Sequence, residues 1–187
     1  MFSLQDQHAL VQIVYDSLQE VVPTLTRNAG WIDLIGSAIK RRVISFDPRI
    51  ECAYGKGRER SSDEREWLFD FLAGLWEPSD RTQERYLMQT IIVGEIECHS
   101  SLDKDFDKLL IADPLVAFFV FPDSIKPKHE DDLEFFHEVA KKRVDRAARR
   151  GVTPLPAFIT ARRSANEGVF TYRFAATPHG WTVKAPH

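Results

Sequence analysis

Two stretches of the chain are apolar without interruption, residues 91–93 and residues 115–121. Short runs of this kind are typical of strands that are buried on both faces. Between them, residues 102–112 place Phe106, Leu109 and Leu110 at helical spacing. We therefore predict a strand, a helix and a second strand, joined by the right-handed parallel crossover that such units adopt.

The rest of the chain divides by the same patterns into helices and short strands. Apolar positions at helical spacing predict three more helices, and alternating or short apolar runs bounded by turn residues predict the remaining strands. The helices cover residues 3–27, 31–43 and 131–150, and the strands cover residues 50–54, 66–72, 86–97, 155–162, 169–175 and 181–184. Ser3 and Asp6 are suited to cap the first helix, and Gly151 to end the last one. The predicted fold class is α/β, with a mixed central sheet flanked by helices.

Composition limits the number of domains and the cellular setting. A chain of 187 residues that is 43% hydrophobic can bury one sizeable core, so we expect a single domain spanning residues 1–187. The start of the chain lacks the basic and apolar segments of a signal peptide, and no apolar stretch is long enough to span a membrane. The two cysteines, Cys52 and Cys98, lie in apolar runs and favour buried, reduced thiols. We expect a cytoplasmic protein without a membrane partner.

Carboxylates interrupt the apolar strands at two places. Glu95 and Glu97 lie two residues apart near the end of the strand at residues 86–97, so they point to one face, about 7 Å apart along the chain. In the strand at residues 66–72, alternation places Asp70 in mid-strand, on the face opposite Phe69 and Phe71. Buried like charges repel each other and resist desolvation, which a fold tolerates when a cation is meant to lie between them.

The succession of elements and acids resembles the PD-(D/E)xK superfamily, the restriction-endonuclease-like nucleases. The residues that carry the resemblance are Asp70 on one core strand, the Glu95-Ile96-Glu97 motif on the next, and the following helix with Lys108. It implies a restriction-endonuclease-like core from the first helix to the strand at residues 115–121, with the C-terminal helix and hairpin as an extension. The usual pattern has lysine where this chain has Glu97.

The resemblance also implies a function, that of a metal-dependent phosphodiesterase. Asp70, Glu95 and the backbone carbonyl of Ile96 would hold Mg²⁺ or Mn²⁺, hard cations that need few carboxylate ligands. Glu97 would act as general base or as ligand of a second ion, and Lys108 would orient the attacking water or stabilise the transition state. The expected partner is nucleic acid, DNA rather than RNA, with a homodimer as an open alternative. Glu20 of the first helix could assist, although a surface role is the commoner one for such a residue.

Other interpretations of the same residues stay open. One is a catalytically inactive protein that keeps the nuclease fold for an interaction or regulatory role, its carboxylates being structural. Another is a carboxylate-based hydrolase of small phosphorylated compounds. Lys108 can also belong to a solvated helix face, paired with a nearby aspartate such as Asp105.

Charge is distributed unevenly along the chain. The formal net charge is -3, which argues against nucleic-acid binding through bulk charge. Residues 63–107 include 12 acidic and 4 basic side chains, whereas residues 140–173 include 9 basic and 2 acidic ones. This segregation is expected if a metal site and a phosphate-facing surface are separate parts of one molecule, and it is equally expected of solvated helix and hairpin faces.

Overall fold

A computed structural model describes most of the elements that the sequence predicts. The described residues are 2–21, 24–25, 30–55, 69–78, 85–96, 108–109, 112, 114–122, 132–152, 155–163 and 170–175. For residues 122, 132–137, 162–163 and 170–175 only the backbone is described. Glu97, Cys98, Asp105 and the strand predicted at residues 181–184 lie outside these ranges, as does most of the helix predicted at residues 102–112.

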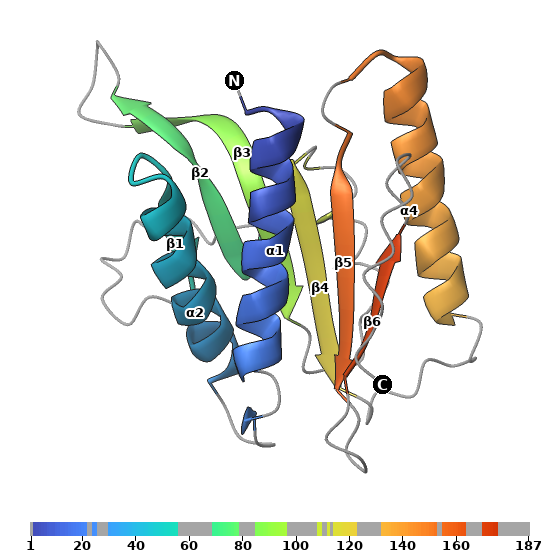
Figure 1. Ribbon diagram of the computed structural model, residues 1–187, viewed down its shortest axis with the longest axis horizontal. Coiled ribbons are helices and arrows are strands. Elements are labelled where there is room, and N and C mark those ends of the chain that lie inside the picture. Colours follow the sequence, from blue (N-terminus) through green and yellow to red (C-terminus); the bar gives the residue numbers. More distant parts are fainter. Residues whose placement is uncertain are drawn as a thin grey trace.

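A mixed sheet of six strands forms the centre of the described part, with the strands side by side in the order of the chain (Figure 1). β1, β2 and β3 pair antiparallel, β3, β4 and β5 pair parallel, and β6 returns antiparallel to β5. The strands are β1 Glu51–Tyr54, β2 Phe71–Pro78, β3 Arg85–Ile96, β4 Val116–Pro122, β5 Ala157–Arg163 and β6 Phe170–Ala175. The predicted α/β class with a mixed central sheet is therefore confirmed.

Helices cover both faces of this sheet. α1 (Leu4–Val21) and α2 (Trp31–Phe46) lie together on one face, and α4 (Asp132–Arg149) lies on the other (Figure 1). Apolar strand residues divide between the two layers. Phe71, Ile92 and Phe118 pack with α1 and α2, whereas Leu72, Val93 and Phe119 pack in the α4 layer. Burial on both faces explains why the central strands read as continuous apolar runs.

Two close contacts fix the positions of α1 and of the central strands. The side chain of Gln7 on α1 is buried and donates hydrogen bonds to the backbone carbonyls of Leu115 and Leu155, which precede β4 and β5. Gly94 of β3 lies beside Phe118 of β4, whose ring occupies the space that a Cβ at Gly94 would need. Glycine at this position therefore lets β3 and the Phe118 ring pack in direct contact.

The N-terminal helices differ from the sequence predictions at their ends. α1 is capped by Ser3 and Asp6 as predicted, since the Asp6 amide donates to Ser3 and the Ser3 amide donates to Asp6. It ends at Val21, two residues before Pro23, instead of continuing to residue 27, because proline lacks the N–H that a helix interior requires. α2 continues to Phe46, three residues beyond the prediction.

The strand that follows Asp70 was placed too early in the sequence. β2 runs from Phe71 to Pro78, so Asp70 lies in a bend at the start of the strand, not in its middle. Phe69 packs in the α4 layer and Phe71 in the α1–α2 layer, so the predicted common face of these two residues is wrong. A bend at Phe69 and Asp70 breaks the strict alternation on which that prediction depended.

Candidate functional site

Strand register places Asp70 beside Glu95. β2 and β3 pair so that Phe71 lies opposite Gly94 and Leu72 opposite Val93. Asp70 directly precedes Phe71, and Glu95 directly follows Gly94, so the two residues are neighbours at this end of the strand pair. Two acidic residues therefore lie at the same end of the β2–β3 pair.

Asp70 is held in this position by the backbone. Its carboxylate accepts a 2.8 Å hydrogen bond from the N–H of Ile96, and its own carbonyl accepts a 3.3 Å bond from the N–H of Gly55. The first of these bonds ties the residue preceding β2 to the last residue of β3. The sequence-based prediction assigned a role to the carbonyl of Ile96, whereas the described contact uses its N–H.

Glu95 is a buried carboxylate on a central strand, with only 4% of its surface exposed. It lies beside Phe119 of β4 and faces the layer that contains Leu72, Val93 and α4. Burying a carboxylate without compensation costs several kcal/mol in real proteins, roughly the stability of a whole domain. A charge at this position therefore requires a cationic partner.

Lys108 supplies positive charge to Glu95. Its Nζ atom lies 3.6 Å from Oε1 of Glu95, and its side chain is 34% exposed. The neighbouring residue Leu109 is buried in the α4 layer, and both residues are helical. Anchoring of Leu109 thus holds Lys108 near Glu95 at the end of β3. We refer to Asp70, Glu95 and Lys108 as the carboxylate site.

The described part of the carboxylate site provides a minimal donor set for a divalent cation. No group of three or more histidine, cysteine, aspartate or glutamate side chains arranged to hold a metal occurs among the described residues, and Glu97 lies outside them. Mg²⁺ usually keeps several waters and binds through one or two carboxylates. The oxygens of Asp70 and Glu95 fit that requirement, although Lys108 already neutralises part of the charge on Glu95.

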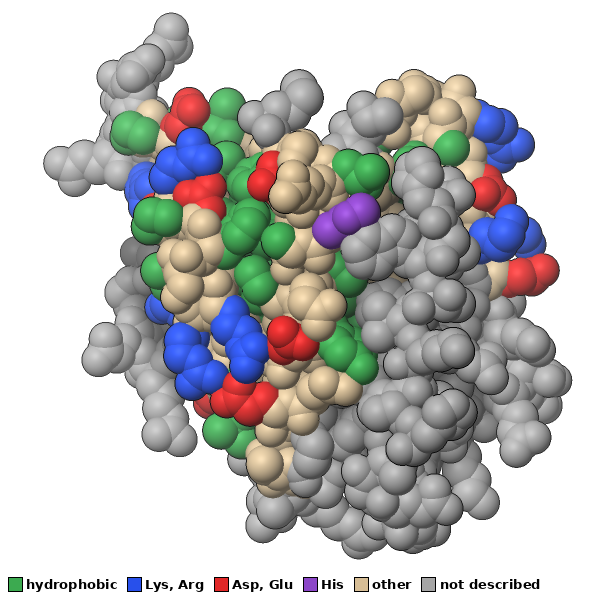
Figure 2. Space-filling view, in the orientation of Figure 1, with side chains coloured by type: hydrophobic (Ala, Val, Ile, Leu, Met, Phe, Trp, Pro, Cys, Tyr) green, Lys and Arg blue, Asp and Glu red, His purple; other side chains and the backbone are tan. Residues whose placement is uncertain are grey.

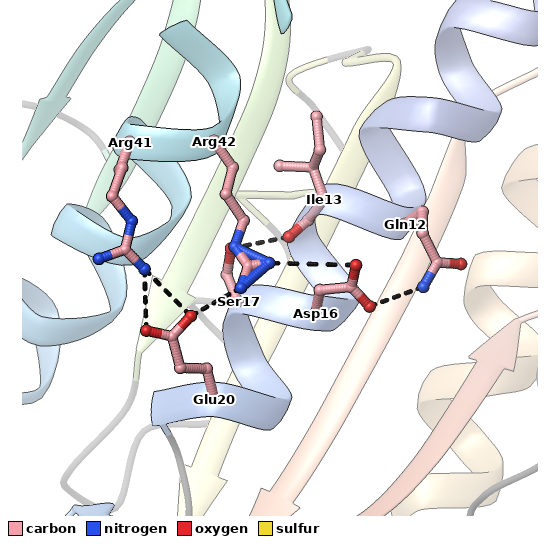
Figure 3. Close-up of polar contacts among 7 residues, drawn as sticks. All are labelled: Gln12, Ile13, Asp16, Ser17, Glu20, Arg41 and Arg42. Carbon is pink, nitrogen blue, oxygen red and sulfur yellow. Dashed lines mark hydrogen bonds and ion pairs between the residues drawn. The ribbon is translucent and has the colours of Figure 1, made fainter. Parts of the chain in front are cut away.

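Glu20 lies on the other side of the sheet. Figure 3 shows its carboxylate held by Arg41 at 2.8 and 3.0 Å and by Arg42 at 2.7 Å, with Asp16 beside Arg42. These bonds, above all the one from Arg41, lower the pKa of Glu20 below its usual range. α1 packs on the face opposite Glu95, so Glu20 belongs to an ion-paired contact between α1 and α2. Arg41 and Arg42 lie within α2, which continues to Phe46.

Comparison of the chain with protein-family models, with curated proteins and with solved structures finds no match. The class that the fold defines is thus an α/β protein with a mixed, helix-covered sheet. What distinguishes it is the pair of carboxylates at the junction of an antiparallel and a parallel strand pair. No helix in the described part of the chain is long and apolar enough to cross a membrane.

Proposed function

We propose that this chain is a metal-dependent nuclease of the restriction-endonuclease-like class that acts on DNA in the cytoplasm. The observation that carries the proposal is that Asp70 accepts a hydrogen bond from the N–H of Ile96, the residue after Glu95, while Lys108 lies 3.6 Å from Glu95. Acidic groups on neighbouring strands with a nearby lysine are the arrangement that the resemblance to PD-(D/E)xK nucleases implies.

The order of elements supports the same class. Helices precede three antiparallel strands, and β4 then pairs parallel to β3 after a connection whose described residues Lys108 and Leu109 are helical. The restriction-endonuclease-like core proposed for residues 4–121 has this succession. β5 and β6 extend the sheet beyond that core, and α4 packs on one face of the sheet.

The proposed chemistry is hydrolysis of a phosphodiester. A bound Mg²⁺ or Mn²⁺ supplies a nucleophilic water near neutral pH and stabilises charge on the phosphate. Asp70, oriented by the Ile96 N–H, and Glu95 would provide the oxygen ligands. A regular strand directs the N–H and the C=O of one residue toward the same neighbour, so the Ile96 carbonyl is suited to join them. Lys108 would stabilise the developing charge on the phosphate, and Glu97 would serve as general base.

A second candidate function has an observation of its own. The charge on Glu95 is compensated by Lys108, and the charge on Asp70 by the Ile96 N–H, within the protein itself. Such internal compensation is what a catalytically inactive protein of the same fold would need in order to keep these acids as structural groups. Its role would then be interaction or regulation.

Cleavage assays on matched variants separate the two functions. The purified protein is incubated with supercoiled, linear and single-stranded DNA and with RNA, in the presence of Mg²⁺, Mn²⁺ or EDTA. Asp70→Asn and Glu95→Gln each remove one charge at the site, and Glu20→Gln removes one on the opposite face. We expect the first two changes to reduce cleavage at least about 100-fold and the third to leave it unchanged.

Two results would contradict the nuclease proposal. Cleavage that survives both Asp70→Asn and Glu95→Gln points to a contaminant or to a different site. Absence of cleavage, together with calorimetry that detects no binding of Mn²⁺ to the wild-type protein, favours the non-catalytic role.

A further inference from the structure

The C-terminal half of α4 carries a concentrated positive charge. Residues 141–150 include six basic side chains and one acidic side chain, in a chain whose net charge is -3. With 3.6 residues per turn, five of the six fall within about one third of the helix circumference. They are Lys142, Arg143, Arg146, Arg149 and Arg150, which we call the arginine face. The opposite side of α4 is apolar and buries Ala140, Val144 and Ala147.

Three of these arginines are not used by the fold. Lys141 pairs with Asp145 at 2.9 Å and Lys142 with Glu138 at 3.8 Å. Arg146, Arg149 and Arg150, by contrast, are exposed, and their side chains form no ion pair or hydrogen bond within the described part of the chain.

Capping of the helix end does not require the arginines either. The N–H of Gly151 donates to the carbonyl of Ala148 at 3.0 Å, and the N–H of Val152 donates to that of Ala147 at 3.1 Å. Gly151 has a φ of 71°, which completes a Schellman motif. Backbone donors therefore already satisfy these two carbonyls.

The arginine face lies on the same side of the sheet as the carboxylate site. Ala140 and Val144 of α4 pack in the layer that contains Phe119, and Phe119 is the register partner of Glu95. α4 ends near the beginning of β5, at the edge of the sheet where β4 also begins (Figure 1). From Val116 at that edge to Phe119 is three strand residues, or about 10 Å. This offset along the strands is shorter than one turn of duplex DNA, which is about 34 Å long.

Among the described residues, the face of the sheet covered by α1 and α2 offers no comparable surface. Figure 2 views the face covered by α1 and α2, where arginine and lysine side chains lie next to acidic ones. Arg41 and Arg42 pair with Glu20, and Arg49 pairs with Asp47 at 2.7 Å. Positive charge on that face is therefore largely neutralised within the protein.

We propose that the arginine face of α4 binds the phosphate backbone of the nucleic acid on which the carboxylate site acts. The inference rests on the proposed nuclease function. Because the net charge is negative, nucleic acid must be attracted by a local cluster and not by the molecule as a whole. The planar guanidinium group donates two parallel hydrogen bonds to a phosphate, which lysine cannot do. Phosphate contacts of this kind position a duplex without reading its sequence.

Binding without cleavage tests the proposal. A fluorescent DNA duplex of about two helical turns is titrated with protein in EDTA at several KCl concentrations, and its anisotropy is recorded. The test variant is R146Q/R149Q/R150Q, and the control is R41Q/R42Q/R49Q, which removes the same charge from the other face. We expect the α4 variant to bind at least about tenfold more weakly, with a salt slope about two to three units less negative, and the control to bind like wild type.

Three results would overturn the proposal. One is an α4 variant that binds the duplex like wild type. Another is an equal loss in both variants, which indicates bulk charge. The third is wild-type protein that binds phosphatidylserine vesicles through these arginines and does not bind the duplex, which indicates a lipid surface.

Failure of this inference is distinguishable from failure of the nuclease proposal. Asp70→Asn should abolish cleavage and leave duplex binding in EDTA intact. If the arginines are needed for binding but no cleavage occurs, the arginine face is supported as a binding surface and the nuclease proposal is contradicted. If cleavage depends on Asp70 but not on the arginines, the nuclease proposal is supported and the binding role of the arginine face is contradicted. Thermal unfolding of R146Q/R149Q/R150Q should match wild type, since these side chains make no described contact that holds the fold.

Discussion

The N–H of Ile96 donates a 2.8 Å hydrogen bond to the carboxylate of Asp70, linking the end of β3 to the residue before β2. A hydrogen bond to a charged acceptor contributes about 1.5–3 kcal/mol. We therefore expect Asp70→Ala to lower the free energy of unfolding by roughly that amount. Asp70→Asn keeps an oxygen that can accept the bond and should cost less than about 1 kcal/mol. Urea unfolding measures both, and equal stability of the two variants would show that the bond contributes nothing.

Replacing Lys108 should destabilise the protein more than replacing its ion-pair partner Glu95. Glu95 is buried, so Lys108→Met leaves a carboxylate without its counter-charge and should destabilise the protein by about 1–3 kcal/mol. Glu95→Gln should cost less, because Lys108 is one-third exposed and can turn toward water. The double variant should recover about 0.5–2 kcal/mol of the summed loss. The exposed pair of Lys141 and Asp145 is the control, with an expected coupling below about 0.5 kcal/mol.

Gly94 should tolerate no larger residue while Phe118 is present. A methyl group at Gly94 overlaps the Phe118 ring, so Gly94→Ala should destabilise the protein by about 1–3 kcal/mol and displace Glu95 on the same strand. Phe118→Leu removes the ring atoms that would overlap this methyl group. We expect Gly94→Ala/Phe118→Leu to be more stable than the sum of the single changes predicts. Simple additivity in thermal unfolding would mean that the clash is relieved elsewhere.

Cys52 should react slowly with thiol reagents in the folded protein. Burial raises the pKa of its thiol from 9.0 to about 11, with Lys40 opposing the shift. The thiolate fraction at pH 8 is therefore small, and labelling with iodoacetamide followed by peptide mass analysis should be slow until urea unfolds the chain. The folded state retains the thiol proton more tightly than the unfolded state does. The contribution of Cys52 to stability is thus complete below pH 9 and is lost as the pH rises from about 9 to about 11.

Glu20 should stabilise the ion-paired contact between α1 and α2 and should not take part in catalysis. Its carboxylate is bound by Arg41 and Arg42 on the face opposite the carboxylate site. Because the hydrogen bond from Arg41 lowers the pKa of Glu20, its contribution to stability is present above the ordinary glutamate pKa and is lost as the pH falls through the lowered value. We expect Glu20→Gln to cleave DNA like wild type and to unfold at a slightly lower temperature near neutral pH. A loss of cleavage in this variant, with the fold intact, would place Glu20 in the site.

Contacts between distant residues were beyond the sequence-based predictions. Apolar patterns predicted β3, β4 and α4 to within two residues, because local periodicity reflects which face of an element is buried. The same reasoning extended α1 past Pro23 and placed Asp70 in mid-strand, since it did not weigh the missing proline N–H and had no signal for the bend at Phe69 and Asp70. The use of the Ile96 N–H by Asp70 and the pairing of Glu20 with Arg41 had no local signal at all.

The sequence by itself determined the succession of helices and strands and the presence of carboxylates in apolar surroundings. Only the tertiary structure decided that Asp70 bonds to the backbone beside Glu95, that Lys108 reaches Glu95, and that Glu20 lies on the far side of the sheet. The physical reason is that burial and helix or strand periodicity depend on neighbours along the chain. Which side chains share a face across strands depends instead on register and on the layer in which each helix packs.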